Sequence, residues 1–284
     1  MYDKIKLWCS VDGESVERMA RGKDATPIFD KDTLIGYKFA VGSMDVKCRK
    51  NSCTIVGALP KMLEPSNIEV MRPEQIKDAV EAVCEAVGKR AEFMRVSYVE
   101  VFNTWDMVRP PIEYLCRLGD AGRYMPREQM GTTLYYGRLV KDATKVICFY
   151  DKGEESKRKG ILMQGNILRY EMRLRGRLSK HGITTADTLY NGRTMAHLCQ
   201  VYKSEYNKIN KISLQDMEIN KDYLLRCLMA NHPDEVQTIM WAMRASSQYT
   251  AQKMYRLKQS VERMQVGRDA LIEELNAAIN GTEW

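Results

Sequence analysis

The segment from residue 168 to residue 175 constrains the fold most, because apolar and charged side chains alternate along it without a break. A β-strand places successive side chains on opposite faces of its sheet. The segment therefore predicts a strand with one face in an apolar core and one charged face. The apolar positions are Leu168, Tyr170, Met172 and Leu174, and the charged positions are Arg169, Glu171, Arg173 and Arg175.

Shorter alternating runs separated by turn residues predict further strands. Between them, Pro73 opens a helix with an apolar stripe, and Gly88 ends it. A short helix is expected after the break at Pro110 and Pro111. The expected strands cover residues 4–11, 34–41, 44–49, 53–59 and 95–103, and three further segments between 132 and 175.

After about residue 183 the pattern changes from alternation to helical periodicity. Apolar residues recur at spacings of three and four, and a heptad-like rhythm runs from Met254 to Leu275. We therefore expect an α+β fold, with an antiparallel sheet-centred domain at 1–183 and an all-helical region at 184–284. A long heptad run is typical of a packed helical hairpin and, less often, of a self-association seam, so a homodimer stays open.

Composition narrows the class of protein. No apolar run approaches the roughly 18 residues that a membrane span needs, and the first residues contain no apolar signal-peptide core. We therefore expect a cytoplasmic protein that does not bind membranes. The 8 cysteines include no Cys-x-x-Cys spacing, and the 3 histidines are not spaced as a metal-binding pair. Neither a disulfide framework nor a zinc site is expected.

Positive charge is concentrated in one part of the chain. The sequence carries a formal net charge of +7, and residues 141–181 alone contain eleven Lys or Arg against five Asp or Glu. A local basic excess is typical of proteins that bind a polyanion such as nucleic acid. A solvated charged face with one basic loop, Lys157-Arg158-Lys159, would give the same pattern, so charge alone leaves both interpretations open.

Tyr150 is the candidate nucleophile. It ends an expected strand and is followed at once by Asp151 and Lys152. A tyrosine that cleaves DNA must lose a proton whose reference pKa is about 10, while cations hold the phosphate and neutralise its charge. Lys152 is placed to supply such a cation. A tyrosine with its ring in the core is more common in proteins, and Tyr135 and Tyr136 are weaker competitors for the nucleophile.

Several short motifs follow one another in a distinctive order. They are Tyr2-Asp3-Lys4, Gly42-Ser43-Met44, Gly57-Ala58-Leu59-Pro60-Lys61, Glu100 within its strand, Tyr150-Asp151-Lys152 and Arg169-x-Glu171. This order resembles the phage and plasmid replication initiators of the gene II/X type and the related Rep_trans rolling-circle initiators. The resemblance spans most of residues 1–180 and implies a catalytic nicking domain. It implies that Tyr150 forms a covalent 5′-phosphotyrosyl bond and leaves a free 3′-OH.

The same resemblance implies a divalent metal. Asp3 and Glu100 match positions that carry acidic residues in the family, with Glu171 as a third ligand, and carboxylates suit Mg²⁺ or Mn²⁺. Glu171 is also flanked by Arg169 and Arg173, and a salt bridge to either is the more common arrangement. Glu100 stands where the family more often has aspartate, which affects the geometry of the ligands.

The expected partners follow from this function. The substrate would be single-stranded or cruciform origin DNA, with the host helicase and replication machinery acting later. A non-catalytic DNA-binding replicon regulator is an alternative, because residues 222–229 and 233–243 match a helix-turn-helix as well as a plain hairpin. A mobilisation relaxase is a weaker alternative, because its usual histidine cluster is missing. The expected DNA contacts are Arg169, Arg173, Arg175, Lys157, Arg158 and Lys159.

Overall fold

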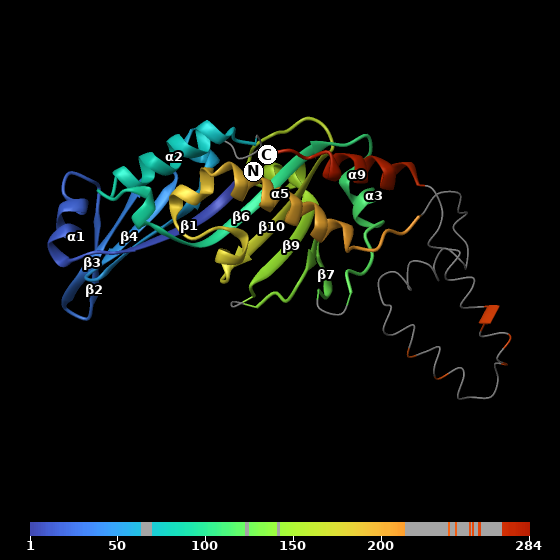
Figure 1. The fold of residues 1–284 in the computed structure, drawn as a ribbon, viewed down its shortest axis with the longest axis horizontal. Helices are drawn as coiled ribbons and strands as arrows, with labels where there is room; N and C mark the ends of the chain where they lie inside the picture. Colours follow the sequence, from blue (N-terminus) through green and yellow to red (C-terminus); the bar gives the residue numbers. More distant parts are fainter. Residues whose placement is uncertain are drawn as a thin grey trace.

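Ten antiparallel strands form one sheet in the described part of the chain (Figure 1). The computed structural model describes residues 1–63, 70–122, 125–140, 143–213 and 269–284, and the single positions 238, 242, 250, 252, 255 and 256. The strand order β2-β3-β4-β5-β1-β6-β10-β9-β8-β7 places β1 and β6 in the middle. The strands are β1 (Tyr2–Ser10), β2 (Thr26–Asp30), β3 (Thr33–Val41), β4 (Met44–Arg49), β5 (Ser52–Ala58), β6 (Arg95–Asp106), β7 (Arg127–Met130), β8 (Thr133–Tyr136), β9 (Lys145–Asp151) and β10 (Ile167–Arg175).

Helices α2 and α5 cover the apolar face of this sheet. Both carry buried apolar stripes that join the core, and Figure 1 shows α5 crossing over β6 and β10. The described helices are α1 (Gly13–Ala20), α2 (Pro73–Glu85), α3 (Pro111–Leu115), α4 (Lys152–Lys157), α5 (Gly192–Asn207) and α9 (Ala270–Asn280). Single 3₁₀ turns are η1 (Pro60–Met62), η2 (Ala91–Phe93), η3 (Leu178–His181) and η4 (Ala186–Tyr190).

Most of the predicted elements are present, which confirms the α+β class. The strand expected at 168–175 is β10, and the helix expected from Pro73 is α2, with Gly88 beyond its end at a left-handed φ of +64°. The sequence pattern does not indicate α1 or β2. Helix α1 is specified by its cap, where Asp12 accepts a bond from the backbone N–H of Ser15 at 2.7 Å. Strand β2 is an exposed edge strand with weak alternation.

The apolar face of β10 forms the centre of the core. The ring of Tyr170 stacks on Phe149 of β9 at 4.4 Å and on Tyr202 of α5 at 4.0 Å. The hydroxyls of Tyr170 and Tyr202 each donate to the other residue's carbonyl oxygen at 3.0 Å. These paired bonds satisfy two buried hydroxyls at once and attach α5 firmly to the sheet.

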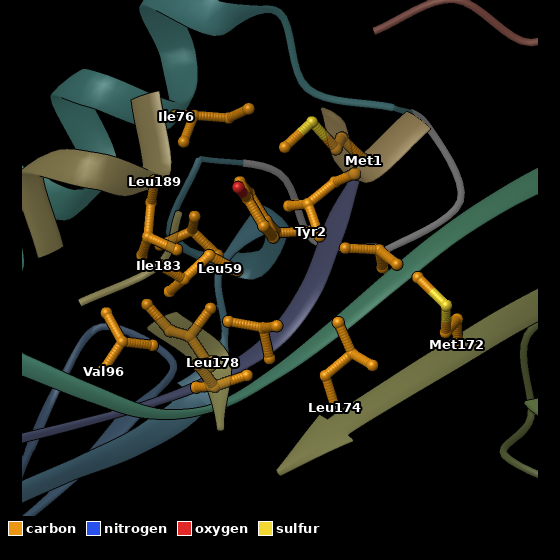
Figure 2. Close-up of a cluster of buried hydrophobic side chains, with 14 of the residues drawn as sticks. Met1, Tyr2, Leu59, Ile76, Val96, Met172, Leu174, Leu178, Ile183 and Leu189 are labelled. Carbon is orange, nitrogen blue, oxygen red and sulfur yellow. The ribbon is translucent and has the colours of Figure 1, made fainter. Parts of the chain in front are cut away.

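A second part of the core lies beneath β1. Figure 2 shows Ile76 of α2 and Leu189 of η4 gathered around Tyr2, with Leu174 of β10 nearby. All four side chains are buried almost completely. The helical layer therefore packs on the sheet at several strands, and not only at β10.

Helices α5 and α9, which lie beyond residue 183, belong to the same core as the sheet. Besides α5, helix α9 packs on α3 and contributes buried Leu275 and Ile279 to the core. The expected boundary near residue 183 therefore does not separate these two helices from the sheet. The candidate helix pair at 222–229 and 233–243, and the heptad-like run up to residue 268, lie outside the described residues apart from isolated positions.

Among the described residues no helix combines the length and the apolar character needed to cross a bilayer.

Candidate active site

The polar face of the sheet carries the chemistry-bearing side chains, and strand register brings them together. Residues that are paired across adjacent strands share a face. On β10, Arg169 lies opposite Tyr150 of β9, and Glu171 lies opposite Cys148 of β9. On the other side of β10, Arg173 lies opposite Glu100 of β6. Three strands far apart in the sequence therefore meet in one charged cluster.

Tyr150 and Glu171 form the centre of the cluster. The Tyr150 hydroxyl donates to Oε1 of Glu171 at 2.5 Å. Burial of the phenol, reinforced by the charge of Glu171, raises the pKa of Tyr150 well above its ordinary value. In this arrangement the hydroxyl keeps its proton, and Glu171 is the group placed to accept it.

Two arginines hold Glu171 from either side. Nε of Arg169 is 2.9 Å from Oε1 of Glu171, and Nη2 of Arg173 donates to Oε2 at 3.0 Å. Burial works against the charge on Glu171, but the two guanidinium groups outweigh it and hold the pKa of this carboxyl below its usual value. Glu171 is therefore ionised at neutral pH although its side chain is only 3 % exposed.

Arg169 is a buried organiser of the site. Its Nη2 lies 2.5 Å from Oδ2 of Asp3, which reaches the cluster from β1. The β1–β6 pairing shifts register between Tyr2 and Ile5, and Asp3 lies within that irregular stretch. The Arg169 guanidinium also lies 3.7 Å from the centre of the Phe102 ring. It is held by two carboxylates and an aromatic face, which fixes its orientation.

A second tyrosine–glutamate pair lies on the other side of Arg173. The Tyr98 hydroxyl donates a short hydrogen bond to Oε1 of Glu100, and Nε of Arg173 is 3.5 Å from the same oxygen. Burial, together with the nearby charge of Glu171, raises the pKa of Glu100 to about 7. Arg173 therefore bridges two carboxylates that differ in their protonation near neutral pH.

Lys152 lies beside the cluster but is occupied. Asp151 caps helix α4 by accepting from the Glu154 backbone N–H at 2.9 Å, which turns the chain back immediately after Tyr150. The Lys152 ammonium is buried and lies 2.6 Å from Oε2 of Glu155. Burial lowers the pKa of Lys152. Its predicted role as the cation beside Tyr150 therefore requires release from Glu155.

The two competing tyrosines of β8 face opposite ways. Tyr136 is fully buried in the core, and its hydroxyl donates to the Gly119 carbonyl at 2.7 Å. Tyr135 lies opposite Cys148 on the polar face, where Arg173 is 6.0 Å from its ring. Of the two, only Tyr135 shares a face with Tyr150.

The predicted metal ligands are brought to neighbouring strands, but each is paired with an arginine. Arg169 lies between Asp3 and Glu171, and Arg173 lies between Glu100 and Glu171. Across the part of the chain that the structure describes, no group of three His, Cys, Asp or Glu side chains could hold a metal ion. In this arrangement guanidinium groups occupy the positions between the three carboxylates, so a metal ion could bind them only by displacing Arg169 or Arg173.

The predicted DNA contacts divide into buried and exposed groups. Arg169 is fully buried, so its described role is to orient carboxylates. The Arg173 side chain is 34 % exposed, which leaves part of its guanidinium open to solvent. The remaining predicted contacts are exposed and lie on β10 or at the end of α4: Arg175, Lys157, Arg158 and Lys159.

Tyr98, Phe102 and Cys148 complete the site and are not indicated by the motifs. The thiol of Cys148 is 3.5 Å from Oε2 of Glu171. The spacing of Tyr98 and Glu100, two apart within a strand, is a signal that could have indicated their shared face. The roles of Phe102 and Cys148 depend on strand pairing, which no local pattern reveals.

Comparison with known proteins leaves the family open. No family model matches the chain, and no curated protein matches it. A solved structure that is similar to this chain is described as a rolling circle replication initiator protein from Geobacillus stearothermophilus. The identity is 10 % and the TM-score 0.42, over 80 % of this chain and 94 % of that one. A TM-score this low carries no functional conclusion, so the function is inferred from the residues of the site.

Proposed function

We propose that the protein is a rolling-circle replication initiator that nicks origin DNA by tyrosine transesterification. The observation that carries the proposal is the hydrogen bond from the Tyr150 hydroxyl to Glu171, a carboxylate held by Arg169 and Arg173 on the polar face of the sheet. It combines a nucleophile, a proton acceptor and cations in one place, as phosphodiester cleavage requires.

The proposed reaction transfers the DNA strand to the enzyme. The Tyr150 oxygen attacks the phosphorus while its proton passes to Glu171. A P–O bond then breaks, so that the phosphate stays on Tyr150 as a 5′-phosphotyrosyl ester and the other strand end leaves as a 3′-hydroxyl after taking up a proton. A host helicase and replication machinery would act on this product.

The two arginines have different tasks in this reaction. Arg173 is partly exposed and can turn towards an incoming phosphate, whereas Arg169 is buried and stays with Asp3 and Glu171. When Arg173 binds the phosphate, Glu171 keeps one cation in place of two. Its pKa then rises, which makes it a stronger acceptor for the proton of Tyr150.

Dependence on Mg²⁺ or Mn²⁺ stays a prediction from the sequence. A bound divalent ion would polarise the phosphate and stabilise the leaving oxygen. Asp3 and Glu100 are the proposed ligands, with Glu171 as a third. As described, these carboxylates contact Arg169 and Arg173, so a metal would compete with guanidinium groups for them.

A DNA-binding replicon regulator without nicking activity is the second candidate. The raised pKa of Tyr150 favours it, because a buried phenol that holds its proton is a poor nucleophile. Both candidates predict DNA binding, and only the first predicts a covalent adduct.

The deciding experiment incubates the protein with Mn²⁺ and a random library of single-stranded DNA labelled at the 3′ end. In the proposed reaction the 3′-labelled fragment stays on the protein after denaturation, and sequencing the captured strands gives the site. Tyr135→Phe is the matched control for Tyr150→Phe, because Tyr135 shares the polar face but not the bond to Glu171. A label that never remains with the wild-type protein would support the regulator.

A further inference from the structure

The polar face continues beyond the candidate site, over β1 and its neighbours, as an open basic surface. On β1, Lys4 and Lys6 are exposed and Trp8 is partly exposed, while Ile5 and Leu7 between them are buried in the core. No ion pair joins either lysine to a described carboxylate within 4 Å. This part of the sheet therefore presents positive charge and an aromatic ring to solvent.

Two aromatic rings on this surface are each accompanied by an arginine. Trp8 lies opposite Arg95 of β6, whose guanidinium is 5.8 Å from the indole centre. Tyr98 lies between Lys6 of β1 and Arg175 of β10, and the Arg175 guanidinium is 5.3 Å from its ring. Aromatic faces alternate here with cations across three adjacent strands.

The basic surface extends towards the edge of the sheet. Trp8 pairs with Thr54 of β5, which pairs with Lys47 of β4, which in turn pairs with Lys38 of β3. These four side chains therefore form one row across the same face of the sheet. Over β3, β4, β5 and β1, which the structure describes completely, the exposed carboxylate on this face is Asp45, and it lies 3.7 Å from Lys38. The surface is therefore strongly positive.

We propose that this surface binds unpaired bases of a single-stranded nucleic acid, which stack on Trp8 and Tyr98 while lysines and arginines contact the phosphates. Aromatic platforms within a positively charged groove or face are the physical requirement for binding single strands without sequence preference. A duplex hides its base faces and would gain only the phosphate contacts.

The surface also leads to the candidate site. Arg169, opposite Tyr150, and Arg175, opposite Tyr98, are six residues apart on β10, which is about 20 Å along a strand. A nucleic-acid strand whose bases stack on Trp8 and Tyr98 would therefore run past Glu100 and Arg173 to Tyr150. The inference rests on the proposed function only in naming this strand as the substrate.

The test compares two fluorescent probes of equal length, an oligothymidylate and an abasic deoxyribose-phosphate strand. The full-length chain carries Tyr150→Phe so that cleavage does not consume the probes. Because both probes carry the same phosphates, the ratio of their dissociation constants reports stacking alone. We expect the oligothymidylate to bind at least tenfold more tightly, since each stacked base contributes roughly five- to 150-fold.

Substitution of the rings should remove this preference. Trp8→Ala and Tyr98→Ala should each weaken oligothymidylate binding by about tenfold and leave the abasic strand nearly unchanged. Trp8→Phe and Tyr98→Phe keep an aromatic ring and should bind oligothymidylate nearly as tightly as the parent chain. Tyr98→Phe also removes the hydroxyl that donates to Glu100, so it tests whether the ring or this hydrogen bond is needed for binding. Phe93→Ala is the matched control, because Phe93 on η2 is also an exposed ring beside an arginine: the Arg90 guanidinium lies 5.8 Å from its centre.

The lysines should act on both probes alike. The double substitution Lys4→Ala and Lys6→Ala should make the salt dependence shallower by about 1.4 in log–log slope. Lys77 is an exposed lysine on α2, and Lys77→Ala should leave the salt dependence unchanged.

The outcomes separate this inference from the proposed nicking function. Equal binding of the two probes by the wild-type surface, or unchanged binding of oligothymidylate by Trp8→Ala and Tyr98→Ala with a native circular dichroism spectrum, would overturn the platform even if an adduct forms. A platform confirmed by these variants, in a protein that never forms an adduct, would support the surface and refute the nickase.

Discussion

Two tyrosine–glutamate pairs lie on either side of Arg173, and they differ in charge. Glu171, bonded to Tyr150, contacts Arg169 and Arg173, and its pKa is held below the usual value. Glu100, bonded to Tyr98, contacts the shared Arg173, and burial raises its pKa to about 7.

The difference shows how one additional guanidinium decides the protonation of a buried carboxylate. Both glutamates are almost completely enclosed, so burial alone would favour the neutral acid in each. Arg169 lies 2.9 Å from Glu171 and, together with Arg173, reverses this preference there. The carboxylate bonded to Tyr150 is therefore ionised at neutral pH, whereas the carboxylate bonded to Tyr98 can gain or lose a proton near neutral pH.

The largest expected effect is on covalent chemistry. Tyr150→Phe should abolish nicking and adduct formation while leaving DNA affinity largely intact, because binding rests on many phosphate contacts. Tyr98→Phe should still form the adduct. Both are measured by denaturing gel electrophoresis with 3′-labelled DNA. If Tyr150→Phe still forms the adduct and either Tyr98→Phe or Tyr135→Phe does not, the tyrosine whose substitution removes the adduct is the nucleophile.

Removal of divalent metal should also stop nicking. We expect activity to be lost in excess EDTA, restored by Mg²⁺ or Mn²⁺, and insensitive to zinc-selective chelation. Asp3→Asn and Glu100→Gln should each raise the metal concentration needed for half-maximal activity more than they weaken DNA binding. Full activity in excess EDTA would show that the arginines neutralise the phosphate without a metal.

Stability should separate the two glutamates. Glu171→Gln leaves Arg169 and Arg173 without their shared anion, and breaking a buried ion pair in this way costs about 3–5 kcal/mol of the free energy of unfolding. Glu100→Gln should cost about 1 kcal/mol or less near neutral pH, where Glu100 is already partly protonated. Urea denaturation measures both. Equal losses would mean that the two carboxylates carry the same charge.

The pH dependence should have opposite signs for the two carboxylates. The pKa of Glu100 is raised from 4.5 to about 7, so the folded state binds this proton more tightly than the unfolded state. The free energy of unfolding should therefore fall as the pH rises from about 4.5 to 7, by about 3 kcal/mol from this group. Glu171, with a lowered pKa, stabilises the fold above about pH 4.5 and loses this contribution as the pH falls through its folded value.

Urea midpoints at about pH 5 and about pH 7.5 test this sign. The wild-type chain should lose stability between these two values relative to Glu100→Gln, which cannot titrate. A difference between the two proteins that does not change with pH would place the pKa of Glu100 outside this window.

The smallest effect on catalysis is expected from removal of residues 214–268. Arg117 contacts both sides of this segment, since its carbonyl accepts from the Ile212 backbone N–H at 2.9 Å and its Nε lies 2.8 Å from Oδ2 of Asp269. A short linker can therefore replace the segment without removing α5 or α9. The shortened protein should form the adduct but lose origin preference, as measured by competition with random DNA. Retained preference would place recognition in the described residues.

A truncation near residue 183 would remove α5 and α9, which contribute side chains to the core. The periodicity after that residue predicts helices correctly for α5, but it does not reveal that Tyr202 stacks on Tyr170. A chain that ends at 183 would expose this ring and the rest of the core beneath α5. Tertiary packing, and not helical pattern, decides where the structural unit ends.

The sequence by itself determined the two faces of β10 and therefore the class of the fold. Strict alternation over eight residues, 168–175, places Arg169, Glu171 and Arg173 on one face whatever their neighbours are, because side-chain direction in a strand is a local property. The structure also confirms the strands predicted around Glu100 and Tyr150, which are β6 and β9.

Only the tertiary structure decided which groups meet. Arg169 and Asp3 are 166 positions apart in the chain, and Tyr150 and Glu171 are 21 apart. Their contacts depend on the strand order β1-β6-β10-β9 and on register, which are set by long-range pairing and core packing. The charged residues could therefore be identified from the sequence. Strand pairing decided that Glu171 contacts Tyr150, Arg169 and Arg173.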